Sequence, residues 1–250
     1  WTTFRLTNAG KEPHFFLLTR LPEGRTLEDY GREVGRAFGG AYDSLEAGTV
    51  DKAGAVRILG TLLPTWYGSA SPAGGVGMVS PGIHGQATVR LDPGTYVMEC
   101  YVKSPDGRFH SELGMIHMLV VTTDSSSTAA PPADLRAAVS NGRIEAPAAV
   151  VPGAHTIALH YAEQPEAGLG NDLHLVRLAD TTRPDAVTRW MDWMELDGLR
   201  TPAPTEFLGG VQEMPAGRTA YFTVDVAPGR YAWVSERPSE HPMAKEFTVE

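Results

Sequence analysis

One thiol, one imidazole and one thioether lie close together in the first half of the chain. Cys100 is the single cysteine, His110 follows after nine intervening residues, and Met115 comes five positions later. A turn-rich stretch from Ser104 to Gly107 separates Cys100 from His110. A single cysteine excludes an internal disulfide and any zinc or iron–sulfur site that needs several cysteines. The chemistry open to this cysteine is therefore that of one thiolate beside an imidazole and a thioether.

The cysteine lies on a predicted strand from Thr95 to Val102. Side chains alternate along a strand, so that Tyr96, Met98 and Cys100 share one largely apolar face, and we expect Cys100 to point inward. The whole chain of 250 residues contains 27 glycines and 19 prolines. Short β-rich runs recur between these turn residues, which is typical of an all-β sandwich. Helices should be a minority.

Two amphipathic helices are nevertheless predicted. The first starts after a capping residue, Thr26, and its apolar face carries Leu27, Tyr30, Val34 and Phe38. The second starts at Pro184, and its apolar face carries Val187, Trp190, Met191 and Met194. We interpret both stripes as core packing.

The two halves of the chain resemble each other. Residues 74–97 and 209–232 are identical at nine of twenty-four positions without a gap, including Gly74-Gly75-Val76 against Gly209-Gly210-Val211. Between the halves lies a stretch rich in Ser, Thr and Pro that cannot contribute to a packed core. The sequence predicts a tandem repeat with domains at residues 1–122 and 134–250, joined by a linker at 123–133.

The first repeat resembles the cupredoxins, the plastocyanin and azurin family of blue copper proteins. The resemblance rests on Asn8 to His14, on Pro93-Gly94-Thr95-Tyr96 followed after three residues by Cys100, and on His110 followed after four residues by Met115. It implies two tandem cupredoxin-like Greek-key β-sandwiches with short helical insertions. It also implies one copper ion in the first domain, with four ligands: His14, Cys100, His110 and Met115.

The resemblance further implies one-electron transfer, because two imidazoles, a thiolate and a weak axial thioether suit both copper oxidation states. A loop His110 near the surface is expected to give the electron its exit, toward a redox partner protein. The Cys100 to His110 spacing is similar to the type 1 site of copper nitrite reductases. Oxidases and reductases of this kind also need a second copper site, but Glu99 stands before the cysteine and no His-x-His occurs. We therefore expect no such enzyme activity.

In the second repeat, Ser235 replaces the cysteine, since Tyr231 and Ser235 align with Tyr96 and Cys100. Three further candidate ligands remain there, namely His174, His241 and Met243. They could form a weak copper site, although a scaffold without its metal is the favoured interpretation. The second repeat also has an extra segment, Arg143 to His155, so an edge strand could be missing from the first. His84 and His117 lie outside the pattern and are expected at the surface.

Charge and hydropathy exclude other classes of function. Acidic residues outnumber basic ones by 30 to 21, giving a net charge of -9, so we expect no nucleic-acid partner. The longest apolar runs fall short of the roughly 20 residues that a membrane helix needs, so no membrane insertion is expected. The chain begins directly in strand-like sequence, as a mature or trimmed chain does. An extracytoplasmic location, whether secreted, periplasmic or at the cell surface, follows from the resemblance.

Two other functions stay open. Both domains could be metal-free modules with a structural or protein-binding role, in which case Cys100 is a small buried residue, His14 is structural and Met115 packs in the core. Copper storage or delivery would use the same four ligands as electron transfer. No Gly-x-Ser-x-Gly elbow, phosphate-binding loop or carboxylate pair supports a hydrolase or a nucleotide-binding protein.

Overall fold

The computed structural model describes residues 1–124, 127–166, 169–200, 202–236 and 243–250. Its strands in the first half are β1 (Thr2–Thr7), β2 (Leu17–Arg20), β3 (Ser71–Pro72), β4 (His84–Val89), β5 (Gly94–Glu99) and β6 (Ile116–Val121). Those in the second half are β7 (Leu135–Ser140), β8 (Arg143–Glu145), β9 (Gly153–Tyr161), β10 (Leu173–Leu178), β11 (Glu206–Val211), β12 (Thr219–Val226), β13 (Gly229–Val234) and β14 (Ala244–Val249).

The described strands form one six-stranded sheet and two four-stranded sheets. The four-stranded sheets have the orders β3-β2-β5-β6 and β11-β10-β13-β14. The six-stranded sheet has the order β1-β4-β12-β9-β7-β8, so it contains strands of both halves. They join where β4 pairs with β12 in antiparallel orientation, with Thr88 opposite Tyr221. The two halves therefore share a continuous sheet, which the sequence did not predict.

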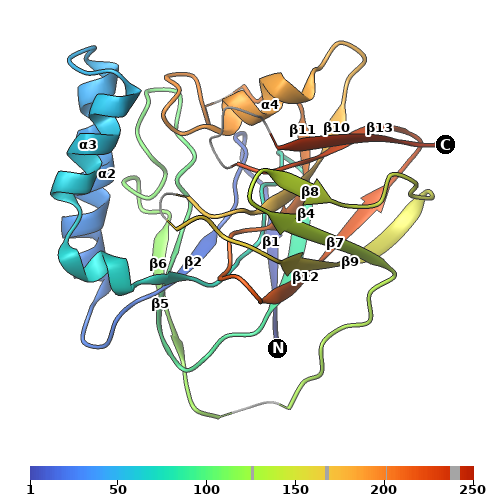
Figure 1. Ribbon diagram of the computed structural model, residues 1–250, viewed down its shortest axis with the longest axis horizontal. Coiled ribbons are helices and arrows are strands. Elements are labelled where there is room, and N and C mark those ends of the chain that lie inside the picture. Colours follow the sequence, from blue (N-terminus) through green and yellow to red (C-terminus); the bar gives the residue numbers. More distant parts are fainter. Residues whose placement is uncertain (125–126, 167–168, 201, 237–242) are drawn as a thin grey trace.

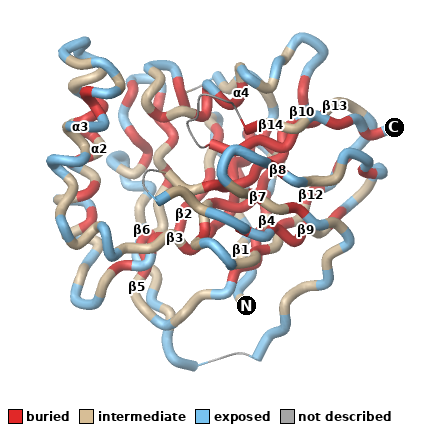
Figure 2. Tube along the Cα trace, in the orientation of Figure 1, coloured by how far each residue is buried: buried red, intermediate tan, exposed pale blue. Residues whose placement is uncertain are grey.

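The core confirms the predicted β-sandwich, because its main cluster draws side chains from all three of these sheets. Leu18 of β2, Val89 of β4, Phe222 of β12 and Trp233 of β13 are each at most 1% exposed and belong to this cluster. Figure 2 shows the buried residues gathered along the strands and the exposed ones on loops and outer helical faces. Burial of apolar surface against facing sheets is the main stabilising term of such a fold.

The helices lie in two places: those of the first half gather on one side of the molecule, and the described helix of the second half lies apart from them beside the sheet of that half (Figure 1). They are α1 (Leu27–Asp29), a π-helix η1 (Tyr30–Gly35), α2 (Arg36–Glu46), α3 (Lys52–Leu62), a 3-10 helix η2 (Thr65–Ser69) and, in the second half, α4 (Pro184–Met191). This is more helix than the single short insertion expected in the first half. The additional α3 has its own signal in Asp51, whose side chain accepts a hydrogen bond from the Gly54 amide at the helix start.

Both predicted helical stripes are confirmed as core. Thr26 forms a capping box with Asp29. Tyr30 and Val34 are buried, and Leu27 and Phe38 pack against the same cluster. In α4, which has Pro184 in its first turn, the buried side chains include Val187, Trp190 and Met191.

Two glycines at corresponding positions of the halves allow strands to approach closely. Gly75 has φ +135°, and a Cβ placed there would lie 2.0 Å from the carbonyl oxygen of Phe16. Gly210 has φ +151°, and a Cβ there would lie 2.1 Å from the carbonyl oxygen of Leu173. Only glycine fits both the backbone conformation and the space. The duplication itself stays a prediction.

The first half begins with β1, which pairs with β4 as β9 pairs with β12. Within residues 1–124, no strand corresponds to β7 and β8. None of the helices in the described ranges is both long enough and apolar enough to cross a membrane.

Candidate metal centre

Three of the predicted ligands converge at one end of the first half. Sγ of Cys100 lies 3.6 Å from Nδ1 of His110 and 3.9 Å from Nδ1 of His14. The two imidazole rings lie 4.8 Å apart between centroids. One sulfur and two nitrogen donors therefore face a common point, although they come from positions up to 96 residues apart in the chain.

The loop between Cys100 and Met115 folds back on itself, which accounts for the long spacing. The amide of His110 donates to the carbonyl of Val102, and the amide of Met115 donates to the carbonyl of His110. The Cys100 amide in turn donates to the carbonyl of Met115 at 3.1 Å. These bonds return His110 to the cysteine, so nine intervening residues do not move the imidazole away from the thiol.

The second half of the chain holds this loop in place. The Lys103 amide donates to the carbonyl of Leu199, and its buried ammonium donates to the carbonyl oxygens of Trp193 and Glu195 at 3.0 and 2.7 Å. The Lys103 ammonium also lies 4.1 Å from the ring centroid of Tyr42. The predicted site thus depends on contacts that cross between the two halves.

A second loop positions His14. His14 and Val79 exchange backbone hydrogen bonds as an antiparallel bridge. The buried Asn8 side chain donates to the carbonyl oxygens of Glu12 and Val79 at 2.7 and 2.9 Å and accepts from the Gly10 amide. Asn8, the first residue of the motif, therefore fixes the segment that carries both Glu12 and His14.

Glu12 sets the orientation of His110. Its carboxylate lies 2.8 Å from Nε2 of His110, while Nδ1 of the same ring faces Cys100. With the ring proton on Nε2, the lone pair of a neutral His110 lies on Nδ1, where a metal ion would need it. No pattern in the sequence predicted this role of Glu12, whose one signal is its place two residues before His14.

The exposure of His110 differs from the expectation. His110 is 3% exposed, with the Glu12 carboxylate against its Nε2, whereas His14 is half-buried. The prediction that His110 lies near the surface as the electron exit is therefore wrong. Cys100, at 2% exposed, is buried as predicted.

Burial also decides the protonation of the site without a metal. Desolvation raises the pKa of the Cys100 thiol to about 12. Desolvation, with the neighbouring His110 as a second cause, lowers the pKa of His14. At neutral pH the cysteine is a thiol and His14 is a neutral imidazole with a free lone pair. A metal ion must displace the thiol proton in order to bind.

The donor separations fit a first-row metal ion. Ligand bonds of about 2.0 Å to nitrogen and about 2.3 Å to sulfur, at an angle of about 120°, separate nitrogen from sulfur by about 3.7 Å. The observed separations of 3.6 and 3.9 Å lie on either side of this value. A set of one thiolate and two imidazoles suits copper in both oxidation states.

Met115 reaches this site with its backbone, and its side chain is 40% exposed. Its role as an axial ligand stays a prediction. Two further histidines behave as expected from the sequence, since His84 and His117 are both exposed.

The corresponding place in the second half holds a buried hydrogen-bond network. Ser235 donates an amide hydrogen bond to the carbonyl of Met243 at 3.1 Å, as Cys100 does to Met115. Its hydroxyl donates to Asp172 at 2.9 Å, and Asp172 lies 2.7 Å from Nε2 of His174. Burial and then Asp172 raise the pKa of the adjacent Glu236 well above its ordinary value.

Asp172, His174 and Glu236 lie close enough together to hold a metal ion. Both ring nitrogens of His174, however, already have hydrogen-bond partners. Its Nδ1 accepts a hydrogen bond from the Met78 amide at 3.0 Å. A neutral imidazole has one lone-pair nitrogen, so Nε2 carries the proton and donates to Asp172. The network therefore favours the interpretation of a scaffold without its metal. His241, another candidate ligand, lies outside the described residues.

Comparison with known proteins gives structural neighbours but no sequence relatives. No protein-family model and no curated protein matches the sequence. Reduced auracyanin from Roseiflexus castenholzii is 14% identical, with a TM-score of 0.34, over 46% of this chain and 94% of that one. An azurin from Methylomonas is 12% identical, with a TM-score of 0.35, over 46% and 95%.

A multicopper oxidase is 14% identical, with a TM-score of 0.28, over 99% of this chain and 74% of that one. The chain is thus similar to cupredoxins and multicopper oxidases, the group that the sequence resembles. At these TM-scores, the likeness says nothing about what this chain binds.

Proposed function

We propose that the first half of this chain binds one copper ion through His14, Cys100 and His110 and passes single electrons. The convergence of two Nδ1 atoms on the Cys100 sulfur carries this proposal. Copper supplies a one-electron couple, because a thiolate favours Cu(I) and imidazoles accept Cu(II). Met115 is the proposed weak axial ligand.

The protein's own groups would prepare the site before any metal arrives. Glu12 holds the His110 ring with Nδ1 toward the sulfur. The loop bonds to Val102 and Met115 fix Cys100 and His110 relative to each other. A site held in this way changes little between oxidation states, and little reorganisation favours fast electron transfer. The half-buried His14 is the proposed exit for the electron, toward a redox partner protein.

The test is a visible absorption spectrum of the full chain titrated with Cu(II). We expect an intense thiolate-to-copper band that saturates at one equivalent, together with a higher melting temperature. Cys100→Ala should lose the band. His117→Gln, which removes an exposed histidine outside the site, is the matched control and should keep it. A spectrum without the band, or a band that survives in Cys100→Ala, would contradict the proposal.

The metal-free alternative predicts a different outcome, namely no band and no thermal shift with copper. Reactivity toward thiol reagents does not separate the two, because burial and a pKa of about 12 protect the Cys100 thiol even without a metal. Storage or delivery of copper would give the band without electron exchange, so the rate of reduction by a soluble electron donor distinguishes it.

We also propose the division into repeats at residues 1–122 and 134–250, joined by the linker at 123–133, and an extracytoplasmic location. The matching orders of the two four-stranded sheets and the matching conformations of Gly75 and Gly210 support the division. Expression of residues 1–122 alone tests it in part. Because β4 pairs with β12, we expect this half to be less stable than the full chain.

A further inference from the structure

A pocket distinct from the candidate metal centre lies between the helical insertion and the second half of the chain. Its cavity volume is about 60 Å³, enough for a small ligand only. The first half contributes residues from η1, α2, η2 and the loop after β5, and the second half contributes Leu169, Trp193 and Glu213. Aromatic residues are the largest group among the fourteen that line it. Six rings line it: Tyr30, Phe38, Tyr67, Tyr101, Phe109 and Trp193.

Five of these rings form a continuous aromatic wall, and Tyr101 lies apart from that series. Tyr67 lies between Tyr30 and Phe38, with ring centroids 6.3 and 6.4 Å apart. Trp193 continues the wall, 5.5 Å from Phe38 and 6.2 Å from Phe109. Because each ring contacts the next, the wall has defined positions and offers a large π surface at little cost in side-chain entropy.

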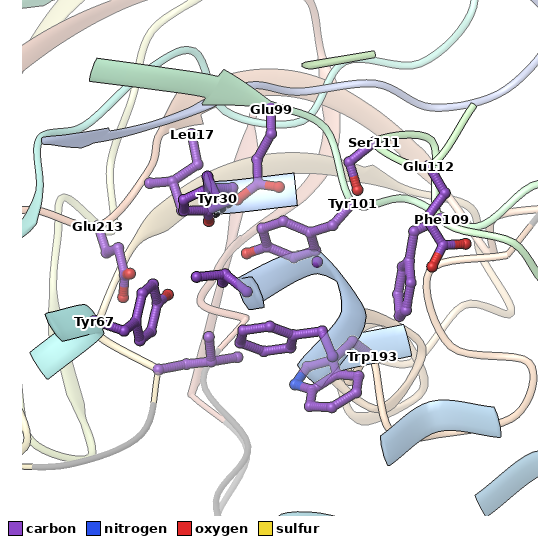
Figure 3. A pocket seen from close by; sticks show the side chains of 14 residues that line it. Leu17, Tyr30, Tyr67, Glu99, Tyr101, Phe109, Ser111, Glu112, Trp193 and Glu213 are labelled. Carbon is purple, nitrogen blue, oxygen red and sulfur yellow. Dashed lines mark hydrogen bonds between the residues drawn. The ribbon is translucent and has the colours of Figure 1, made fainter. Parts of the chain in front are cut away.

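Three carboxylates are placed around this aromatic wall. Glu99 accepts a hydrogen bond from the Tyr30 hydroxyl, and Glu213 accepts one from the Gly170 amide. Figure 3 shows Glu213 beside Tyr67 at one end, Glu112 beside Phe109 at the other, and Glu99 near Tyr30 and Tyr101 between them. Among the described residues that line the pocket, none is Lys, Arg or His. The acidic groups therefore have no cation in the wall to balance them.

We propose that this pocket binds a small organic cation, an ammonium group that carries alkyl substituents. Aromatic faces attract a cation, and the attraction is stronger in a partly desolvated site. The alkyl groups would contact Phe38 and Trp193, while Glu99 and Glu213 balance the charge.

A bare metal ion is a poorer occupant of this pocket. Clusters of His, Cys, Asp and Glu donors close enough to hold a metal ion occur in the described residues at Cys100 and at Asp172, and neither includes Glu99, Glu112 or Glu213. The three carboxylates are spread around the rings, as charge balance for an alkylated cation requires. This binding does not depend on copper at Cys100.

The test compares choline with its uncharged isostere 3,3-dimethylbutan-1-ol by calorimetric titration of the full chain above about pH 8, where the Glu213 carboxyl, with its pKa of about 7, is ionised. The two have the same shape and differ in charge. Choline should bind at least about tenfold more tightly, because cation–π attraction is strongest at a site that is partly shielded from water. Equal affinity for the two compounds would overturn the proposal, as would failure of choline, tetramethylammonium and methylammonium to bind at millimolar concentration.

Variants assign the binding to this pocket. Glu213→Gln keeps the shape of the side chain and should weaken choline binding about tenfold, while Glu206→Gln, an exposed glutamate on β11, should leave it unchanged. Phe38→Leu, at a half-buried position, should also weaken it. Circular dichroism in the aromatic region checks that each variant is folded. Choline binding that neither Glu213→Gln nor Phe38→Leu affects would place the ligand elsewhere and overturn the proposal.

Discussion

Glu12 and His110 lie 98 positions apart in the chain, yet the Glu12 carboxylate is 2.8 Å from Nε2 of the His110 ring. The contact joins the loop after β1 to the loop between β5 and β6, the two segments that carry the candidate ligands. It leaves Nδ1 of His110 directed at Cys100. A carboxylate in this position orients a histidine ligand and raises its basicity.

Removal of this contact should weaken copper binding. We expect Glu12→Ala to lower the affinity about 10- to 100-fold, as loss of such a supporting carboxylate usually does. Glu12→Gln, which keeps an acceptor oxygen, should recover part of the loss. Competition with a chelator of known affinity measures the change. Glu23→Gln is an exposed control. An unchanged affinity in Glu12→Ala would show that the contact does not orient the ligand.

Copper binding should release a proton from Cys100. Since the thiol has a pKa of about 12 without a metal, the protein binds this proton throughout the neutral range and loses it when the thiolate binds copper. The apparent affinity should therefore rise about tenfold per pH unit between about pH 6 and about pH 8. Because the pKa of His14 is lowered, this residue should release few protons when copper binds in this pH range. Titrations at several pH values check the slope, and a flat profile would contradict it.

Stability should fall as the pH rises through the acidic range. Burial raises the pKa of both Glu99 and Glu213 to about 7, from an ordinary value of 4.5. Between these values the folded chain binds more protons than the unfolded chain, so each pH unit of increase destabilises it. Glu213→Gln should reduce this slope. Urea unfolding at about pH 5, 6 and 7 measures the free energy of unfolding across this range. If the free energy of unfolding depends on pH equally in Glu213→Gln and in the unsubstituted chain, the pKa of the Glu213 carboxyl is not raised by folding.

Lys103 should make the free energy of unfolding rise with pH, in a higher pH range than the two glutamates. Desolvation lowers the pKa of this buried ammonium from 10.5 to about 7. Between these values the unfolded chain binds more protons, so stability should rise with pH, as far as 10.5. In Lys103→Met, a side chain of similar length without the charge, this rise should be absent. If unfolding experiments show the same rise in both proteins, the ammonium of Lys103 is charged in the folded chain.

Substitution of the two close-approach glycines should be severe. Gly75→Ala and Gly210→Ala would each place a Cβ within van der Waals distance of a carbonyl oxygen at positive φ. We expect a loss of more than about 3 kcal/mol in the free energy of unfolding, or no folded protein. Gly68→Ala, where no atom lies within 4 Å of the added Cβ, should change it by less than about 0.5 kcal/mol. Similar small effects at Gly75 and Gly210 would contradict the close approach.

Patterns within a few residues of sequence were enough to predict the local features of this protein. The capping signal at Thr26, the apolar stripe through Tyr30 and Val34 and the proline at the start of α4 are all confirmed, because they depend on neighbours within a few residues. Cys100 is buried as strand alternation predicted, although the strand is shorter than expected: β5 ends at Glu99, one residue before it. The candidate ligands could be named since their spacing resembles a known family.

How distant segments meet could be learned from the three-dimensional structure but not from the sequence. Periodicity identifies a strand but not its partner, so the pairing of β4 with β12 could not be predicted. Three other features could not be predicted for the same reason. They are the contact of His110 with Glu12, the hydrogen bond from the Met78 amide to His174, and the acidic aromatic pocket. Each depends on contacts between residues far apart in sequence, and such contacts follow from packing of the whole chain rather than from any local pattern.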